Sequence, residues 1–229
     1  MTVSAAPPWP SSLATPPGVY TPQADTLFLA KALQGEGLAP GMDVLDLGTG
    51  NGTLAVYAAQ HGARVTATDI NRRAVATARL NALRAGQHIA FCRGDLLSPI
   101  RGRRFDLVVC NPPYVPAPDS TEDDDGRAQT GRAWDAGQDG RAILDRICGE
   151  VPQALRPGGV LLMVQSALSR PEETLLQLNG SGLAAAVSDR IDIPFGPVLR
   201  SRLAWLRDRR LVSPQEMLEE LVIIRAQQY

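Results

Sequence analysis

The sequence predicts an α/β fold, a Rossmann-like doubly wound domain with a seven-stranded, mostly parallel sheet. Short apolar runs alternate with helical stretches from residue 20 to residue 225, which is the pattern of repeated strand and helix units. The first apolar run leads into a glycine-rich turn that opens a helix, as in folds that bind nucleotide-like ligands. The expected strands are residues 43–47, 64–69, 88–92, 105–110, 160–164, 183–187 and 219–225.

The chain has no internal repeat and no change of composition that would divide it. We therefore expect one domain over residues 18–229, preceded by a flexible proline-rich leader over residues 1–17. With 229 residues and 44% hydrophobic content, the chain can bury one sizeable core.

The charge and cysteine content restrict the class of protein. A net charge of -1 argues against non-specific nucleic-acid binding by the whole surface. The three cysteines are scattered and suggest neither a disulfide framework nor a metal cluster, so we expect a reducing, cytoplasmic setting. No apolar window approaches the roughly 20 residues that span a membrane, and we expect a soluble protein without membrane contact.

The first expected helix follows a short polar stretch that begins at Tyr20. Thr21 is expected as its N-cap, Pro22 as its first residue and Gly35 as its stop. Its polar first turn, which includes Thr26, is explained either by capping alone or by a lid over a cofactor, and we favour the lid.

The turn after the first strand has the spacing G-x-G-x-G, which differs from the G-x-G-x-x-G fingerprint of dinucleotide-binding folds. An acid, Asp46, stands two residues before the first glycine. Such a carboxylate would repel a pyrophosphate, but it suits a sulfonium cofactor that carries an amino group. The candidate cofactor contacts in this stretch are Asp46, Gly48, Thr49, Gly50 and Gly52.

Two more acids stand at the ends of the next two strands. Asp69 ends the second strand, where Rossmann-type folds place the carboxylate that holds ribose hydroxyls. Asp69 could instead be the N-cap of the next helix, a role that Asn71 also suits. After the third strand, Asp95 can accept a hydrogen bond from an adenine amino group and Leu96 can pack on the adenine ring.

The fourth strand runs into four candidate catalytic residues, Asn111, Pro112, Pro113 and Tyr114. The prolines fix the direction of the backbone carbonyls. The Asn111 side-chain oxygen and a proline carbonyl can accept both N–H groups of a planar nitrogen, which draws electron density onto that nitrogen, while Tyr114 can stack on the acceptor. An isolated tetrapeptide of this kind is often only a turn. Its place after three strand ends that carry acids favours a methyl-transfer site.

Two charged segments are left open by the sequence. Residues 115–137 include five acids between positions 119 and 125, and they form either a solvated surface or a loop that gates substrate or docks a partner. Trp134 is expected to anchor this segment to the core. Residues 190–214 form a basic, arginine-rich insert between the last two strands, which is either a solvated surface helix or a contact for substrate or partner.

These motifs resemble class I S-adenosylmethionine-dependent methyltransferases, and among them the HemK-like protein glutamine N5-methyltransferases. The resemblance covers roughly residues 18 to 170, and its first and last motifs are similar to the short eukaryotic and archaeal branch. It implies the class I methyltransferase fold and the cofactor S-adenosyl-L-methionine, which leaves as S-adenosyl-L-homocysteine. The cofactor-binding residues expected from the motifs and their immediate neighbours are Tyr20, Thr26, Asp46, Gly48, Thr49, Gly50, Gly52, Asp69, Ile70, Asp95, Leu96 and Asn111.

The same resemblance implies that Asn111 to Tyr114 bind a glutamine amide. In that branch the substrate is the Gly-Gly-Gln loop of a translation release factor, and a small zinc-binding activator subunit covers apolar surface of the catalytic domain. Three alternatives stay open at this stage: methylation of adenine in DNA or RNA, methylation of a small-molecule amine or amide, and a cofactor-binding scaffold without enzymatic activity.

Overall fold

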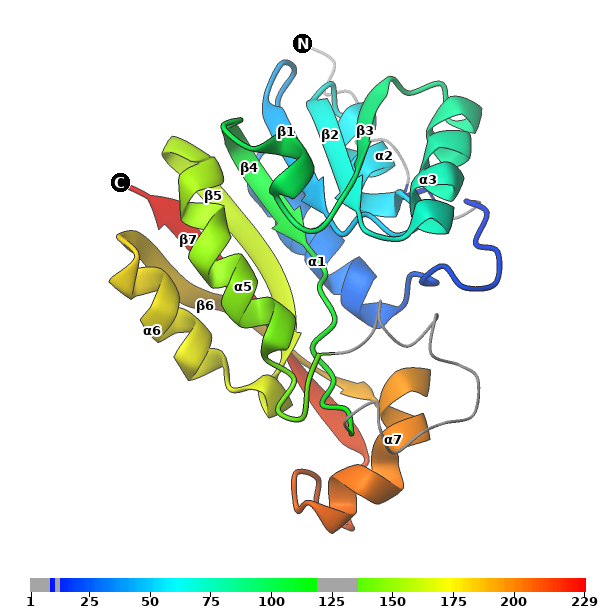
Figure 1. The fold of residues 1–229 in the computed structure, drawn as a ribbon, viewed down its shortest axis with the longest axis vertical. Coiled ribbons are helices and arrows are strands. Elements are labelled where there is room, and N and C mark those ends of the chain that lie inside the picture. The colour runs from blue at the N-terminus through cyan, green and yellow to red at the C-terminus, as the bar shows by residue number, and fades with distance from the viewer. Residues whose placement is uncertain (1–8, 11–12, 119–135) are drawn as a thin grey trace.

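The computed structural model describes residues 9–10, 13–118 and 136–229, and a seven-stranded sheet runs through its centre (Figure 1). The strand order is β3-β2-β1-β4-β5-β7-β6, and β7 alone runs against its neighbours. The predicted mostly parallel, seven-stranded sheet is therefore confirmed. The strands are β1 (Asp43–Leu47), β2 (Arg64–Asp69), β3 (Ile89–Arg93), β4 (Phe105–Cys110), β5 (Leu155–Ser166), β6 (Leu183–Pro194) and β7 (Leu218–Gln228).

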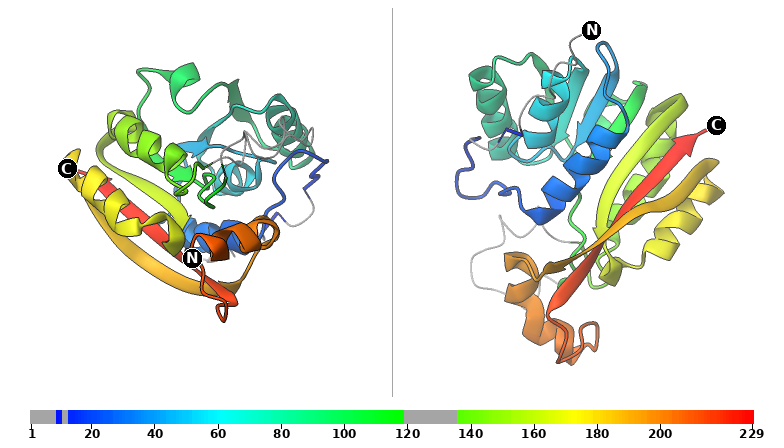
Figure 2. Two further views of the ribbon diagram at one scale, coloured as in Figure 1. Left: turned by 60° about the horizontal axis from the view of Figure 1, so that its bottom comes forward. Right: turned by 180° about the vertical axis from the view of Figure 1, so that it is seen from behind.

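Helices cover both faces of the sheet. Helices α5 and α6 lie on the face turned toward the viewer in Figure 1, and α1 lies on the opposite face, which the rear view of Figure 2 shows. The α-helices are α1 (Ala24–Gly35), α2 (Thr53–Gln60), α3 (Arg72–Arg84), α5 (Ala142–Glu150), α6 (Pro171–Gly180) and α7 (Pro197–Asp208). Short 3₁₀ turns span Ser98–Ile100, Val151–Ala154 and Ala167–Ser169.

The central strands are continuous apolar runs in the sequence because helices cover both of their faces. Leu45 of β1, Val108 of β4 and Leu161 of β5 are completely buried. The core thus lies under the middle of the sheet, and the strand ends are left to form a site.

Helix α1 begins two residues later than expected. The first helical residue is Ala24, and Gln23 occupies the N-cap position without a side-chain cap bond, so the prediction of Thr21 as N-cap and Pro22 as first residue was wrong. The first turn instead contains Asp25 and Thr26, whose side chains accept hydrogen bonds from Asn111, the residue that follows β4. Tertiary contacts of this turn, rather than a side-chain cap, accompany the start of the helix.

The chain between α5 and β5 also differs from expectation. The helical spacing of Ile143, Leu144, Ile147 and Val151 predicts a helix over residues 140–155, but α5 ends at Glu150 and a 3₁₀ turn containing Pro152 follows. Proline has no N–H to donate to the preceding turn, so it ends the α-helix. Strand β5 then begins at Leu155, before the two glycines that the prediction had placed outside the strand.

Strand β6 is longer than expected and extends to Pro194. Its pairing with β7 continues from Leu183 to Pro194, across a register shift near Ser188. The first five residues of the predicted basic insert 190–214 are therefore strand, and the connection between the last two strands spans residues 195–217.

The described part of the proline-rich leader packs on the domain and is not loose. The Trp9 ring lies 5.3 Å from the Tyr57 ring, centroid to centroid. Ala14 exchanges two backbone hydrogen bonds of 2.9 Å with the side chain of Asn81, which is completely buried in α3. A buried amide needs partners, and the leader supplies them.

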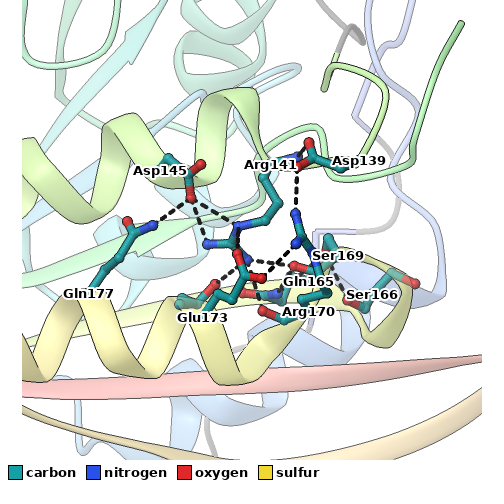
Figure 3. Close-up of polar contacts among 10 residues, drawn as sticks. Asp139, Arg141, Asp145, Gln165, Ser166, Ser169, Arg170, Glu173 and Gln177 are labelled. Atoms are coloured by element: carbon teal, nitrogen blue, oxygen red, sulfur yellow. Dashed lines mark hydrogen bonds and ion pairs between the residues drawn. The ribbon is translucent and has the colours of Figure 1, made fainter.

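A buried arginine joins α5 to α6 (Figure 3). Arg141 is 1% exposed, and its guanidinium lies between the first turns of these two helices. It donates hydrogen bonds or forms ion pairs with the Ser169 and Arg170 carbonyls, the Thr174 hydroxyl and the carboxylates of Asp145 and Glu173. With all sides of the fork occupied, the cation acts as a structural brace.

Candidate active site

A cavity of about 600 Å³ lies at the carboxyl ends of β1, β2 and β4, where open α/β sheets place their ligands. All sequence-predicted site residues line it except Asp46 and Gly52. The sheet thus gathers side chains that are far apart in the sequence at one edge.

The glycine turn forms one side of this cavity. Gly48, Gly50 and Gly52 all have positive φ, which explains the unusual spacing because only glycine adopts this conformation without strain. The Gly48 and Thr49 amides donate to the Thr68 carbonyl of β2, and both bonds measure 2.9 Å. The turn is therefore fixed to the neighbouring strand.

Asp46 lies beneath the turn and not on the cavity wall. It is 1% exposed, and its Oδ2 accepts hydrogen bonds from the Thr49 hydroxyl at 2.6 Å and the Ala55 amide at 3.0 Å. Burial, and to a lesser degree the nearby Asp69 charge, raise the pKa of Asp46 to about 7. The structure thus gives Asp46 a role in holding the turn and the start of α2.

Gly52 is also a support residue. A Cβ built on it would lie 2.9 Å from the Ala78 Cβ of α3. Gly52 does not line the cavity, and its bare α-carbon allows α2 and α3 to pack closely. A contact of Gly52 with a cofactor stays a prediction.

Asp69 lines the cavity, as expected for a residue that holds ribose hydroxyls. Its Oδ2 accepts from the Gly50 amide at 2.9 Å and its Oδ1 from the Asn71 amide at 2.8 Å. Burial raises the pKa of Asp69, and these two hydrogen bonds oppose the rise. The N-cap of α3 is Asn71, whose side chain accepts from the Arg73 amide, so capping does not account for Asp69.

Ile70, Asp95 and Leu96 form the outer wall of this side. Both carboxylate oxygens of Asp95 accept hydrogen bonds from Arg146 of α5, at 3.1 and 2.9 Å. Each Asp95 oxygen thus already accepts one hydrogen bond from the protein and can accept another from a ligand. Leu96 has a φ of 45°, which is rare for a branched side chain and turns it toward the cavity.

The other side of the cavity is organised around Asp25, which the sequence analysis did not select as a site residue. Its Oδ2 accepts hydrogen bonds from Asn111 Nδ2 at 3.1 Å, from the Tyr114 hydroxyl at 3.2 Å and from the Tyr20 hydroxyl. Its Oδ1 accepts from the Thr26 amide at 2.6 Å. In sequence, an acid in the first turn of a helix indicates only favourable interaction with the helix dipole.

These contacts fix the orientation of Asn111. Its Nδ2 donates to Asp25 and also to the Thr26 hydroxyl, at 3.2 Å. An amide nitrogen has two hydrogens, and both now have partners, so the amide oxygen is turned the other way. No described residue donates to that oxygen, which leaves it able to accept a hydrogen bond from a ligand.

The two tyrosines beside Asp25 stay protonated. Burial is the main cause that raises the pKa of Tyr20 and of Tyr114 above their usual range, and the Asp25 charge adds to it. Both hydroxyls therefore remain hydrogen-bond donors to Asp25. The bond from Tyr114 fixes the position of its ring next to Pro113.

A second acid that sequence reasoning missed is Glu219, at the start of β7. Because β7 runs antiparallel to β5, its first residues lie at the edge where the parallel strands end. Glu219 is 5% exposed, lines the cavity, and its Oε1 has no hydrogen-bond partner among the described residues. Burial, with a smaller contribution from the Asp25 charge, raises its pKa to about 7, and a hydrogen bond from Ser166 opposes the rise.

The strand order with one reversed strand, β7, and the glycine turn beside Asn111 to Tyr114 define the class I methyltransferase fold. The family model described as "Methyltransferase small domain" matches residues 11–124. A putative protein N5-glutamine methyltransferase, MJ0928 of Methanocaldococcus jannaschii, is 37% identical over 180 residues, which cover 78% of this chain and 88% of the relative.

The release factor glutamine methyltransferase of Deinococcus radiodurans is 38% identical over 170 residues, 73% of this chain. The match spans only 58% of that bacterial protein's length. Among solved structures, the Mtq2–Trm112 complex of E. cuniculi, described as responsible for methylation of the eRF1 termination factor, has a TM-score of 0.66 at 27% identity and covers 93% of this chain and 99% of its own.

A more distant structure, the 16S rRNA methyltransferase RsmC of T. thermophilus in complex with AdoMet and guanosine, has a TM-score of 0.56 at 20% identity and shows the fold alone. It covers 93% of this chain and 46% of RsmC. From these relatives, the chain belongs to the family of HemK-like protein N5-glutamine methyltransferases. The resemblance read from the motifs is confirmed.

Some expectations concern features outside this site. Trp134 and the acidic residues 119–125 lie outside the described residues. Within the part of the chain that the structure describes, no group of three or more His, Cys, Asp or Glu side chains is arranged to hold a metal. No helix in that part has the length and apolar character needed to cross a membrane. The three cysteines are free thiols, and the cytoplasmic setting stays a prediction.

Proposed function

We propose that this protein transfers a methyl group from S-adenosyl-L-methionine to the side-chain amide nitrogen of a glutamine in a protein, and releases S-adenosyl-L-homocysteine. The observation that carries the proposal is the fixed orientation of Asn111, whose nitrogen is held by Asp25 and Thr26 while its oxygen is left for a ligand. The names of the relatives, protein N5-glutamine and release factor glutamine methyltransferases, support the same acceptor.

The residues at the glycine turn fit the cofactor. A Cβ built on Gly48 would meet no atom within 4 Å, so the backbone there is open to close approach by a ligand. Asp69 would hold the ribose hydroxyls, and Ile70 and Leu96 would pack on the adenine ring, with Asp95 beside its amino group. When bound, the sulfonium supplies an electrophilic methyl group. The acids on this wall complement its positive charge.

The acceptor side of the cavity activates a weak nucleophile. An amide nitrogen is a poor nucleophile because its lone pair is delocalised into the carbonyl. The Asn111 oxygen and the Pro112 carbonyl would accept its two N–H groups, which returns electron density to the nitrogen and aims it at the methyl group. Pro112 and Pro113 keep the carbonyl directions fixed, and Tyr114, anchored by Asp25, would lie against the planar amide. The methylated nitrogen then loses a proton to solvent.

We infer further that the protein substrate is a translation release factor with a Gly-Gly-Gln loop. The bacterial relatives are named for that substrate, and the E. cuniculi structure is described as a methyltransferase for a termination factor. The E. cuniculi protein is a complex with Trm112. The small zinc-binding activator that the family resemblance implies would find an apolar surface on α3, where Leu80 and Leu83 are 43% and 75% exposed beside the outermost strand, β3.

The proposal is tested with purified protein, radiolabelled cofactor and a protein that carries a Gly-Gly-Gln loop. Label is expected on the glutamine, and none on the same protein with that glutamine replaced by asparagine. The variant Asn111→Ala should methylate roughly 10²- to 10³-fold more slowly, because it lacks an oxygen aimed at the acceptor nitrogen. Asn179→Ala, on the far end of α6, is the matched control and should keep full activity.

Two further measurements make the test decisive. Calorimetry with S-adenosyl-L-homocysteine should show binding by the wild-type protein. Duplex DNA and RNA are offered as competing acceptors in the same assay. Label that appears on adenine and not on glutamine would refute the proposed acceptor and favour a base-modifying enzyme.

A further inference from the structure

We propose that the α7 segment, which we define as residues 195–217, is the docking element for the protein that carries the acceptor glutamine, and that it binds an acidic patch next to that glutamine. This inference rests on the proposed function and adds the surface that selects the substrate. It is carried by the position of the segment, by its own small core and by its exposed arginines.

The α7 segment forms the wall of the cavity on the acceptor side. Phe195, Leu199 and Arg200 line the same cavity as Asn111. Figure 1 shows α7 extending beyond the sheet, away from the glycine turn and from α3. A protein that inserts a side chain toward Asn111 would therefore meet α7 as it approaches.

A side-chain contact ties the α7 segment to the catalytic residues. Arg202 Nη1 donates to the carbonyls of Val115 at 2.8 Å and Pro116 at 3.3 Å, the two residues that follow Tyr114. A macromolecule bound on α7 is thus held at a fixed distance from the acceptor site. A docking element needs such a contact in order to position the bound substrate protein relative to Asn111.

The segment has a small hydrophobic core of its own. Phe195, Leu199, Leu206 and Val212 are buried against one another, with Trp205 packed beside them. Arg200 Nε donates to the Phe195 carbonyl at 2.6 Å, which fastens the start of the helix. The apolar face of α7 is therefore satisfied, and its outer face presents polar side chains on a rigid support.

That outer face is basic. The α7 segment has five arginines and two acids, in a chain whose net charge is -1. Arg200, Arg209 and Arg210 are exposed, and none of the three takes part in an ion pair between described residues. Elsewhere in the described part of the chain, exposed arginines such as Arg64 and Arg156 are paired with acids, while others such as Arg101 and Arg104 are not. The arginines of the α7 segment differ from these unpaired ones in belonging to a segment that lines the cavity. Arginines that the fold leaves without acids are available to a partner.

An acidic protein surface fits this patch better than a nucleic acid does. The patch is confined to one short segment, whereas a nucleic-acid surface usually extends along a groove or a whole face of a basic domain. The relatives are named for protein substrates. Complementary charge at the rim of an interface speeds association and selects the partner without a large apolar contact.

The experiment compares two synthetic peptides with the same central Gly-Gly-Gln, one flanked by glutamates and the other by serines. With the double variant Arg209→Glu/Arg210→Glu, KM for the glutamate peptide should rise roughly tenfold with kcat unchanged, since two favourable rim charges become repulsive. The serine peptide should be methylated as by the wild type. Added salt should weaken wild-type use of the glutamate peptide and not of the serine peptide.

The matched control is Arg101→Glu/Arg104→Glu, which makes the same charge change at exposed positions before β4, at the opposite edge of the sheet. It should leave both peptides unaffected. Arg209→Gln/Arg210→Gln removes the charges without reversing them and should give a smaller rise in KM. If the wild type uses both peptides equally, or if the variant loses both equally, the docking role is wrong.

Binding is also measured without methyl transfer, by fluorescence anisotropy of the labelled glutamate peptide and of a single-stranded RNA of equal length. Tighter binding of the peptide, lost in the Arg209→Glu/Arg210→Glu protein, supports docking even if no methyl transfer to glutamine occurs. Failure of methyl transfer with intact peptide binding therefore refutes only the proposed function. Tighter binding of the RNA, lost in the same variant, overturns the inference of a protein partner.

Discussion

At the scale of single residues, Asp25 determines the geometry of the proposed acceptor site. One carboxylate receives hydrogen bonds from Tyr20 and from both ends of the motif Asn111 to Tyr114, which stand 86 and 89 residues further along the chain than Asp25. Its acceptor-only chemistry forces the Asn111 nitrogen toward it and the Asn111 oxygen away. In the proposed mechanism Asp25 acts through Asn111 and is a positioning residue.

The substitution Asp25→Asn keeps the shape and replaces one acceptor oxygen by an N–H donor. Because the Asn111 amide then loses the partner that fixes its orientation, kcat for glutamine methylation should fall by roughly 10²-fold. The affinity for S-adenosyl-L-homocysteine, measured by calorimetry, should change little. Asp192→Asn, on exposed strand β6, serves as control. Unchanged kcat in Asp25→Asn would contradict the positioning role.

Sequence reasoning could place residues at one edge of the sheet where they stand at the end of their own strand, and their roles stay predictions. Gly48 and Asn111 each follow a strand, Asp69 ends one, and the carboxyl ends of parallel strands lie at one edge. Asp25 and Glu219 escaped prediction because their roles depend on how α1 and β7 approach β4, which no local pattern encodes. Asp46 stands next to the correct turn, but its burial under that turn appears only in three dimensions.

At the scale of elements, Arg141 shows how α5 and α6 are joined (Figure 3). Arg141→Met keeps much of the side-chain length but leaves the carbonyls of Ser169 and Arg170 without a donor. We expect a loss of about 2 kcal/mol in the free energy of unfolding, the cost of such unsatisfied buried groups. Urea unfolding measures it, with Arg84→Met on the exposed end of α3 as control. Equal unfolding midpoints would show that Arg141 does not brace the helices.

The strands themselves were predictable because each is an apolar run between turn residues. Their ends were less so. Strand β6 extends to Pro194 because its pairing with β7 continues through a polar stretch, and pairing between distant strands leaves no mark in the local sequence. Helix α1 begins without a side-chain cap, so Thr21 and Pro22, which are typical of a helix N-terminus, led to a wrong predicted start.

At the scale of the whole molecule, buried acids make stability depend on pH. The pKa of Glu219 is raised from 4.5 to about 7, and that of Asp46 from 3.8 to about 7. A raised folded pKa means that the native state holds a proton which the unfolded chain has released. The stability that this proton provides is complete below the unfolded pKa values and is lost as the pH rises through about 7.

The substitution Glu219→Gln should therefore reduce the difference in unfolding free energy between pH 5 and pH 8 by roughly 1 to 3 kcal/mol. Urea unfolding of the cofactor-free protein at the two pH values measures it. Glu220→Gln is the control, since its side chain is more exposed and paired with Arg190. If the pH difference persists unchanged in Glu219→Gln, the buried carboxyl is not protonated in the native state.

The reversed direction of β7 has a consequence for how such a molecule changes over evolution. By entering the sheet from the site edge, β7 brings Glu219 and the α7 segment to the reaction centre, while its own pairing is with β5 and β6 and not with the strands that carry the glycine turn. Specificity for the methylated macromolecule is thereby encoded in a module separate from the one that binds the coenzyme. Mutations between β6 and β7 can retarget the enzyme while its methyl source stays the same.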